Sequence, residues 1–343
     1  MQIRRWKDNR VGSGVDLPKL LLTTISGILD ASRIEAEEKG FRILYTLPPS
    51  HVIVDGDVDS ALRLRTIESV SRILAENILE SIEKRNIRLS LRNSLKQLTG
   101  GEKTYTVKAK IYGSCFSEKI LKIITIREII RVHDRTAIGK KGSLLRIILD
   151  CEKKFLLIAE QVNEEPLHIR KYYVAKHPSP LNPVIAASIP FIAGKAYRRI
   201  YDPFCGSGTI PIEFKHVRKI EALGSDINHI FVKSAVKNAK AAGVSIDFFI
   251  ANVRKIPVAG NVDFIATDPP RGERLKAPNM WRYLKPVFEL GTRLDADICL
   301  ITPYFKITNL IAERKGYKLF KKTSTFQGGN KVYIVFYTKE DSL

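Results

Sequence analysis

The chain has 343 residues, of which 44% are hydrophobic and 27% charged, and its 57 lysines and arginines against 36 acidic residues give a formal charge of +21. This composition excludes disordered, collagen-like and simple coiled-coil chains, and the length suggests two or three domains. No apolar run approaches the ~18–20 residues of a membrane-spanning helix, and the basic opening segment MQIRRWKDNR is not followed by the apolar core of a signal peptide.

The cysteines and histidines do not have the spacing of a metal site or a disulfide framework. Cys115, Cys151, Cys205 and Cys299 are widely scattered without a CxxC pair, and the six histidines do not cluster. We therefore expect no metal and no disulfide framework, and a reducing, cytoplasmic location.

The first 78 residues have the pattern of a small α+β domain. Gly40 closes a helical run, and the turn Pro48-Pro49-Ser50 separates two β-rich runs. The predicted elements are a strand at 19–24, a helix at 28–40 and strands at 41–46 and 51–57. A long amphipathic helix is then predicted from three-to-four spacing of Leu64, Ile67, Val70, Leu74 and Ile78. The order βαββα is typical of a ferredoxin-like domain, here over 1–78.

A second unit is predicted over 79–170. An alternating strand at 104–113 precedes a helix at 117–134, and two strands at 143–150 and 154–161 form a hairpin. Between the helix and the hairpin lies the basic loop GKKG, Gly139–Gly142. This loop is either an ordinary surface turn or a phosphate contact.

The positive charge is concentrated in this second unit. Residues 84–146 contain 16 lysines and arginines against four acidic residues, a net +12 in one stretch. Because neutralising phosphates releases counterions, nucleic acid is the favoured partner. The few interleaved aromatic residues favour recognition of duplex or shape over stacking on single strands. The alternative is a generically basic protein or one rich in surface ion pairs.

From about residue 175 onwards, apolar β-runs alternate with helical patterns. This alternation predicts a doubly wound, mostly parallel sheet with ligand sites at the carboxyl ends of its strands. The predicted strands lie within 197–204, 222–227, 245–252, 263–270 and 298–303, and a last strand within 328–339 returns to the sheet.

The first strand-to-helix turn of this part has the features of a nucleoside-binding loop. Asp202 ends the β-run, and Gly206 and Gly208 lie in the loop before a helical run that begins near Thr209. Glycines allow a ligand to approach the backbone, although tight turns also use them for geometry alone. Asp226 lies 18 residues after Gly208, at the end of the next predicted strand. An acid there can bind both ribose hydroxyls or cap a helix.

The cofactor expected from this loop lacks a pyrophosphate. Pro211 stands where a dinucleotide fingerprint needs its third glycine, and no GK[ST] sequence follows the loop. S-adenosylmethionine fits, with Asp202 at its amino-acid end and Asp226 at its ribose. Asn252, after the third strand, could reach the adenine amino group.

The fourth strand ends in the sequence Thr267-Asp268-Pro269-Pro270-Arg271-Gly272. Two prolines after an acid form a rigid loop, whose carbonyls together with the Asp268 carboxylate can accept both hydrogens of an exocyclic amine. The amine lone pair would then face an electrophilic methyl group, and catalysis would depend on positioning and desolvation. The alternative is a tight turn without chemistry.

These motifs resemble those of the class I S-adenosylmethionine-dependent amino-methyltransferases, and the N-terminal half resembles the companion domains of THUMP-domain RNA methyltransferases. The motifs that carry the resemblance are DPFCGSGT, GSDI and DPPRGERL, preceded by HPSPLNPVIAA, which is similar to the segment that closes over the methionine part of the cofactor. The LRLRTIESVSRIL segment resembles the helix of the ferredoxin-like domain. The resemblance implies a Rossmann-like methyltransferase domain at 171–343 behind an α+β RNA-binding half, with a THUMP-like domain at 79–170.

The resemblance also implies the residues of the site and the reaction. Methyl transfer to the N2 amine of a guanosine in the acceptor stem of tRNA would use Asp268, Pro269, Pro270 and Arg271. The implied cofactor-binding residues are Asp202, Phe204, Gly206, Gly208, Thr209, Asp226, Ile227, Asn252 and Val253. We expect tRNA as the partner, no membrane association and a monomer.

Two positions depart from the family pattern. Arg271 replaces an aromatic residue that stacks on the target base, and Asn252 replaces an aspartate. A guanidinium can also stack on a base, and an amide still offers an acceptor. The alternatives are a non-catalytic RNA-binding protein, or a methyltransferase acting on rRNA, on another tRNA guanosine, on adenine or on a protein amide.

Overall fold

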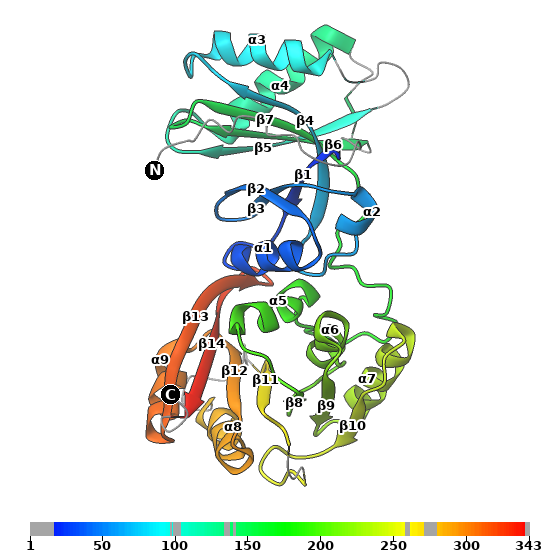
Figure 1. Ribbon diagram of the computed structural model, residues 1–343, viewed down its shortest axis with the longest axis vertical. Helices are drawn as coiled ribbons and strands as arrows, with labels where there is room; N and C mark the ends of the chain where they lie inside the picture. The colour runs from blue at the N-terminus through cyan, green and yellow to red at the C-terminus, as the bar shows by residue number, and fades with distance from the viewer. Residues whose placement is uncertain are drawn as a thin grey trace.

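The computed structural model describes residues 17–96, 98, 104–133, 138–139, 142–257, 261–270 and 280–339. These residues form two α/β halves, each built on its own sheet, and helix α1 (Leu29–Glu38) and helix α5 (Pro183–Ala193) meet where the halves join (Figure 1). Arg271 and the two lysines of the predicted GKKG loop, Lys140 and Lys141, lie outside the described residues.

The N-terminal half contains one sheet, whose described strands have the order β2-β3-β1-β4-β7-β6-β5. Neighbouring strands are antiparallel except for β5 and β6. Besides α1, its elements are β1 (Lys19–Thr23), β2 (Arg42–Leu47), β3 (His51–Asp55), α2 (Val58–Ala61), β4 (Ser69–Ile78), α3 (Lys84–Leu95), β5 (Tyr105–Tyr112), α4 (Glu118–His133), β6 (Ser143–Asp150) and β7 (Phe155–Gln161).

The prediction of a long helix from Leu64 to Ile78 is wrong, because residues 69–78 form strand β4. Residues 69–72 pair with β1, and residues 71–78 pair with β7. Tertiary pairing on both sides of this segment overrides its helical spacing. Ile78, the last residue of the supposed apolar stripe, is 85% exposed. Because β4 pairs with strands of both predicted N-terminal domains, one sheet runs through 19–161.

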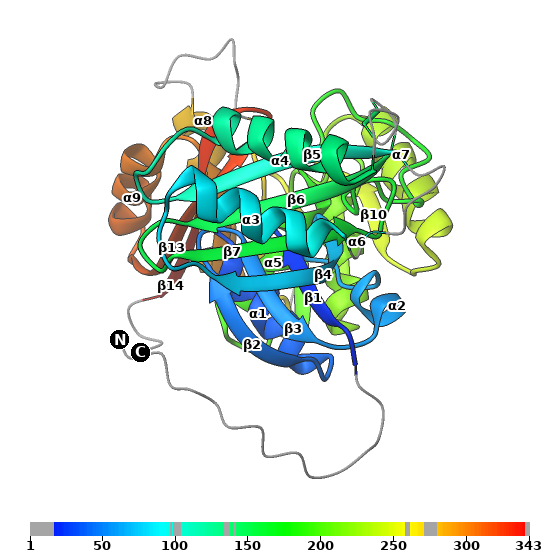
Figure 2. The same cartoon turned by 90° about the horizontal axis from the view of Figure 1, so that it is seen from above.

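Helices α3 and α4 lie side by side over one part of this sheet (Figure 1, Figure 2). Their buried residues, among them Ile87, Leu91, Leu121 and Ile124, share one apolar cluster with residues of the strands beneath. The helix predicted at 117–134 and the hairpin at 143–161 are confirmed. Helix α3 was not predicted.

The expectation of no disulfide is also wrong, because Cys115 and Cys151 form one. Strands β5 and β6 are parallel, and their register places Tyr112 opposite Asp150. Cys115 and Cys151 follow these strands at the same end of the sheet, with their Cα atoms 6.0 Å apart. Cys205 and Cys299 are free and buried.

The C-terminal half contains the doubly wound sheet predicted from the alternating pattern. Its described strands have the order β10-β9-β8-β11-β12-β14-β13, parallel from β10 to β12 and antiparallel beyond. Its remaining elements are β8 (Arg199–Asp202), α6 (Thr209–Arg218), β9 (Glu221–Asp226), α7 (His229–Ala242), β10 (Asp247–Ile250), β11 (Phe264–Thr267), α8 (Trp281–Leu294), β12 (Asp297–Thr302), α9 (Phe305–Arg314), β13 (Tyr317–Gln327) and β14 (Asn330–Lys339). Strand β13 was not predicted.

The two faces of this sheet have separate apolar cores. One contains residues of α5 and α6, and the other contains residues of α8 and α9. Ile28 and Ala31 belong to the first core, so α1 of the N-terminal half packs into the C-terminal half. None of the described helices is long and apolar enough to cross a membrane.

Candidate active site

Three carboxylates stand where neighbouring parallel strands end. Asp202 is the last residue of β8, Asp226 is the last residue of β9, and Asp268 directly follows β11. Strand β8 lies between β9 and β11 in the sheet. The chain order reverses at this point, and ligands of open α/β sheets bind at such switch points.

Asp202 organises the loop that follows it. Its Oδ1 accepts hydrogen bonds from the backbone N–H of Phe204 at 3.0 Å and from Oγ1 of Thr267, at the end of β11, at 2.6 Å. Asp202 therefore links the first loop to the strand that leads into Asp268-Pro269. Both hydrogen bonds that the described residues donate to the Asp202 side chain are accepted by Oδ1.

Asp202 is 2% exposed, and this burial raises the pKa of its carboxyl group to about 8. Hydrogen bonds from Thr267 and Phe204 oppose the rise, while the negative charges of Asp268 and Asp226 add to it. The group is thus protonated at neutral pH without a ligand. A cation placed beside it would favour the carboxylate, as an opposite charge does for any buried acid.

The glycines of the loop are required by its backbone path. Gly206 and Gly208 have φ angles of 50° and 86°, in the left-handed region that favours glycine. A Cβ atom on Gly208 would also lie only 3.0 Å from Cζ of Phe248 and 3.1 Å from Cβ of Ala235. Helix α6 begins at the buried Thr209 directly after this turn.

Asp226 contacts the same loop from the next strand. Its Oδ2 accepts from the backbone N–H of Gly206 at 3.2 Å, and its Oδ1 accepts from that of Asn228 at 2.8 Å. The N-cap of α7 is Asn228, whose side chain accepts from the backbone N–H of Ile230. The helix-capping alternative for Asp226 is therefore wrong, and the ribose-binding role stays a prediction.

A pocket of about 230 Å³ opens beside this loop. Phe204, Ile227, Asn252 and Val253 line it, all four among the predicted cofactor-binding residues. Sequence reasoning missed the other lining residues in the described part of the chain, which are Pro203, Ala251, Arg254, Arg282 and Tyr283. Arg282 and Tyr283 belong to the first turn of α8, beyond the end of the DPPRGERL motif. The pocket combines apolar walls with few polar groups, as small-molecule sites do.

The Asp268-Pro269-Pro270 corner joins β11 to residues outside the described part of the chain. Asp268 is partly exposed, Pro269 is buried and Pro270 is exposed. The charge of Asp268 acts on the pKa of Asp202, so the two groups are electrostatically coupled. The predicted roles of Asp268 and its prolines remain predictions, as does the role of Arg271.

The segment before α5 lies against the first loop. The backbone N–H and C=O of Ala175 bond to the side chain of Asn238 in α7, whose Nδ2 also donates to the carbonyl of Ser207 at 3.0 Å. Ser207 Oγ donates to the Tyr173 hydroxyl at 3.2 Å. A Cβ on Gly206 would lie 3.5 Å from Nε2 of His177. His177, the first residue of HPSPLNPVIAA, thus lies beside the predicted cofactor loop.

Within the described residues, no group of three or more His, Cys, Asp or Glu side chains is arranged to hold a metal ion. Cys205, in the first loop, is buried, and burial raises the pKa of its thiol well above the ordinary value. A buried, protonated thiol is a poor nucleophile.

Comparison with known proteins identifies the C-terminal half. Residues 170–323 match the family model of the RMKL-like methyltransferase domain. The resemblance to methyltransferases predicted from the motifs is therefore confirmed for this part of the chain. The match does not include the N-terminal half, so the THUMP domain stays a prediction.

Two kinds of relative share this domain. The chain is 29% identical over 164 residues to a tRNA (guanine(10)-N2)-dimethyltransferase of Methanothermobacter thermautotrophicus, a match that covers 45% of this chain and 47% of the relative. It is also 29% identical over 189 residues to a ribosomal RNA large subunit methyltransferase K/L of a Shewanella species, covering 41% of this chain and 26% of the relative. The chain thus spans less than half the length of these relatives.

Solved structures extend the likeness of fold to nearly the whole chain. TrmN from Thermus thermophilus matches with a TM-score of 0.76 at 21% identity, covering 94% of this chain and 99% of that one. A possible methylase from Clostridium difficile 630 matches with a TM-score of 0.74 at 20% identity, covering 94% and 98%. The predicted fold class, a Rossmann-like domain behind an α+β half, is confirmed as a mixed α/β fold with two sheets.

Proposed function

We propose that the protein transfers a methyl group from S-adenosylmethionine to the exocyclic N2 amine of a guanosine in the acceptor stem of tRNA. The observation that carries this proposal is the meeting of Asp202, Asp226 and Asp268 at the switch point of the sheet, beside a pocket lined by Phe204 and Asn252. The match of residues 170–323 to a methyltransferase domain supports the reaction class.

The residues present fit S-adenosylmethionine. The buried Asp202 would give up its proton beside the positive charge and, as a carboxylate, accept hydrogen bonds from the ammonium of the amino-acid end. Asp226, which in this structure accepts from Gly206, would exchange or share that bond with the ribose hydroxyls. Ile227, Asn252 and Val253 would contact the adenine in the pocket. The cofactor supplies a methyl group on a positively charged sulfur.

Asp268 and the diproline corner would hold the acceptor. The carboxylate and the carbonyls of Pro269 and Pro270 would accept both hydrogens of N2, which fixes its lone pair toward the methyl carbon. The N–C bond forms as the C–S bond breaks, its electron pair stays on sulfur, and N2 then loses one proton to solvent. The guanine must leave its helix, since its N2 cannot be reached in line within a stacked pair.

The outer helices α3 and α4 are the proposed tRNA contact. The two helices form one layer over the sheet in Figure 2, and their exposed basic residues are Lys84, Arg85, Arg88, Lys119, Lys122, Arg127 and Arg131. Two adjacent helices with a clear excess of positive charge match the backbone of a duplex rather than a base edge. This layer would form part of the proposed THUMP-like domain at 79–170.

Nucleoside analysis tests the reaction and the substrate. The full chain is incubated with labelled S-adenosylmethionine and unmodified tRNA, and the RNA is then digested to nucleosides. We expect N2-methylguanosine, which fragment mapping locates in the acceptor stem. A labelled methyl group on guanosine 10 of tRNA would show that the proposed acceptor-stem position is wrong. Label in ribosomal RNA alone would refute tRNA as the substrate. Failure to bind S-adenosylmethionine in calorimetry would leave only the RNA-binding alternative.

The Asp268→Ala variant tests the assigned catalytic role. We expect it to bind the cofactor with unchanged affinity and to lose transfer by about 10²-fold or more, because N2 is no longer positioned. The matched control is Asp247→Ala, which removes an exposed carboxylate at the opposite end of β10. Transfer by Asp268→Ala at the rate of the control would refute the role.

A further inference from the structure

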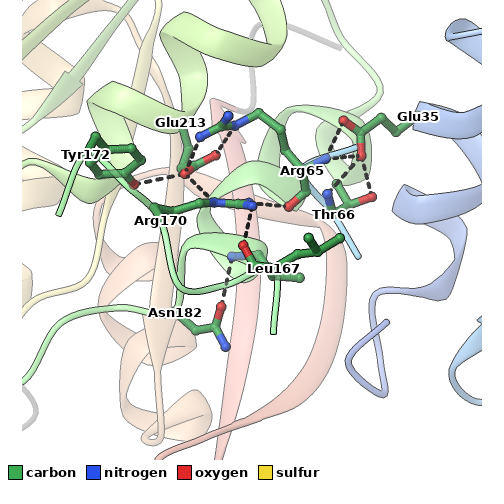
Figure 3. A network of polar contacts seen from close by, with 9 residues as sticks. Glu35, Arg65, Thr66, Leu167, Arg170, Tyr172, Asn182 and Glu213 are labelled. Atoms are coloured by element: carbon green, nitrogen blue, oxygen red, sulfur yellow. Dashed lines mark hydrogen bonds and ion pairs between the residues drawn. The ribbon is translucent and has the colours of Figure 1, made fainter. Parts of the chain in front are cut away.

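Glu213 is a fully buried carboxylate at the junction of the two halves, and three donors surround it (Figure 3). The Arg65 guanidinium donates to both of its oxygens, from Nε at 2.6 Å and from an Nη at 2.8 Å. Arg170 Nε donates at 3.1 Å and the Tyr172 hydroxyl at 2.8 Å. Arg65 belongs to the N-terminal half, Glu213 belongs to α6, and Arg170 and Tyr172 lie in the connecting segment.

The N-terminal side of this network is itself fixed. Glu35 of α1 is 1% exposed and accepts from the backbone N–H of Arg65 and Thr66 and from the Thr66 hydroxyl. Arg170 adds a hydrogen bond from an Nη to the Arg65 carbonyl at 2.6 Å. The segment 65–66 is therefore held between α1 on one side and α6 with the connecting segment on the other, as Figure 3 shows.

The charge state of Glu213 follows from these partners. Burial alone would raise its pKa, but the positive charges of Arg170 and Arg65, with hydrogen bonds from Arg65 and Tyr172, hold the pKa below the ordinary value. The group is thus a buried carboxylate at neutral pH. A bidentate guanidinium–carboxylate pair fixes orientation as well as distance, which a single apolar contact does not.

The position of Glu213 along α6 links this network to the proposed cofactor loop. The helix begins at Thr209, directly after Gly206-Ser207-Gly208, and Glu213 lies one turn further, about 6 Å along the helix axis. On the same side, the chain that leaves Tyr172 continues through Tyr173, which bonds to Ser207 in that loop. A shift of Glu213 would thus move the loop together with the helix.

We infer that Glu213 is a positioning residue that fixes the RNA-binding half at one orientation to the methyl-transfer site, through Arg65. This inference rests on the proposed function for its substrate. An RNA held by α3 and α4 reaches the site productively only if both halves keep that orientation. The network thereby sets which nucleotide of a long substrate faces Asp268, whereas a short substrate need not touch both halves.

Other contacts hold the halves together without fixing this angle as closely. Ile28, directly before α1, and Ala31 of α1 share an apolar core with residues of α5, which keeps the halves in contact. A second ion pair, Arg218 with Glu38, also crosses the junction, but the side chains are 29% and 43% exposed. Exposed pairs contribute little. Thr323 donates to the Gly27 carbonyl and Asn182 to Glu68 across the same junction, but these are single hydrogen bonds, whereas the bidentate buried pair fixes an angle as well as a distance. Variants of Arg65 should consequently loosen the junction without separating the halves.

The first experiment measures orientation directly and needs no activity. Spin labels are attached to cysteines placed at the exposed positions Lys122 of α4 and Lys237 of α7, and the distance distribution is recorded in the full chain. We expect one narrow distribution, broadened by Arg65→Ala and partly restored by Arg65→Lys. The control Arg33→Ala, which removes an exposed pair with Glu37 within α1, should leave the width unchanged. An unchanged width in Arg65→Ala would overturn the inference.

The second experiment separates positioning from general damage. Transfer is compared between full-length tRNA and a short hairpin that carries the target guanosine but cannot reach α3 and α4. We expect Arg65→Ala to lower kcat/KM for tRNA by about tenfold or more, with unchanged cofactor affinity and an unchanged rate on the hairpin. Equal losses on both RNAs would mean a distorted site and would overturn the inference.

The two experiments also distinguish this inference from the proposed function. A wild type that methylates neither RNA refutes the proposed reaction, while the distance distribution still decides the role of Glu213 and Arg65. If Arg65→Ala does not fold, Tyr172→Phe removes one donor from Glu213 at nearly constant volume. That variant should broaden the distribution in the same direction and by less, and no broadening in a folded Tyr172→Phe would count against the network.

Discussion

The buried Asp202 should make the stability of the ligand-free protein depend on pH, and Asp202→Asn should remove that dependence. The asparagine keeps the shape and can still accept from Thr267 and Phe204 at Oδ1. It cannot ionise. The substitution therefore changes the charge of this position at high pH and leaves most of its contacts in place.

The size of the effect follows from the pKa of about 8 in the folded protein against an ordinary value of 3.8. Below 3.8 both the folded and the unfolded states hold the proton. Between 3.8 and about 8 only the folded state holds it, so the free energy of unfolding falls by roughly 1.4 kcal/mol per pH unit as pH rises. Above about 8 both states are ionised and the loss is constant. From pH 5 to pH 8 the wild type should lose roughly 4 kcal/mol through this group.

Urea denaturation of the wild type and Asp202→Asn at pH 5 and pH 8 measures the effect. Other titrating groups contribute equally to both proteins, so their effect cancels in the difference between the two free energies of unfolding. We expect that difference to move in favour of the variant by roughly 4 kcal/mol between the two pH values. A difference that is the same at both pH values would show that Asp202 ionises normally in the folded protein.

Three further predictions test the loop, the disulfide and the cofactor. Gly208→Ala should lower the free energy of unfolding by about 1–3 kcal/mol, because φ is 86° and the new Cβ would crowd Phe248 and Ala235. The control for the backbone angle alone is Gly243→Ala, at φ 68° with nothing within 4 Å of the new Cβ, and equal losses of stability in the two variants would exclude a contribution from crowding. Cys115→Ser should lower the free energy of unfolding by about 4 kcal/mol, the amount expected for a disulfide between residues 36 apart in the sequence. Reductant should cause the same loss in the wild type, and a wild type that keeps its full stability under reductant would contradict the prediction. Between pH 6 and 7, where the ligand ammonium stays protonated, S-adenosylmethionine affinity measured by calorimetry should rise by up to about tenfold, and a flat profile would argue against pairing with Asp202.

The residues at the strand ends could be predicted from the sequence because each depends on local signals. Asp202 and Asp226 each follow a short apolar run and precede a helical pattern, and the parallel order brings such ends to one edge. The same reasoning placed Asp268 after β11. It could not find Arg282 and Tyr283, because what brings them to the pocket is the packing of α8 rather than any motif.

The errors in the N-terminal half have physical causes. Residues 69–78 have apolar spacing that fits a helix, yet they pair with strands on both sides, and only the partner strands decide the outcome. Helix α3 was missed for a different reason. Its buried Ile87, Leu91 and Leu95 recur every four residues, but the positions between them are mostly polar or basic and hide the pattern. The disulfide likewise depends on the register of β5 and β6, which no local pattern reveals.

Strand β4 connects the outer helices mechanically to the buried network at the junction. It begins at Ser69, three residues after Thr66, which Glu35 holds against α1. Its far end pairs with β7, and Asn77 donates to the Ser94 hydroxyl of α3 at 3.0 Å. A load on α3 and α4 from a bound RNA would therefore pass along one continuous strand to segment 65–66, and from there through Arg65 to Glu213 and α6. Because strands and buried ion pairs deform little compared with loops, this route would let the proposed RNA contact and the proposed cofactor loop keep one geometry.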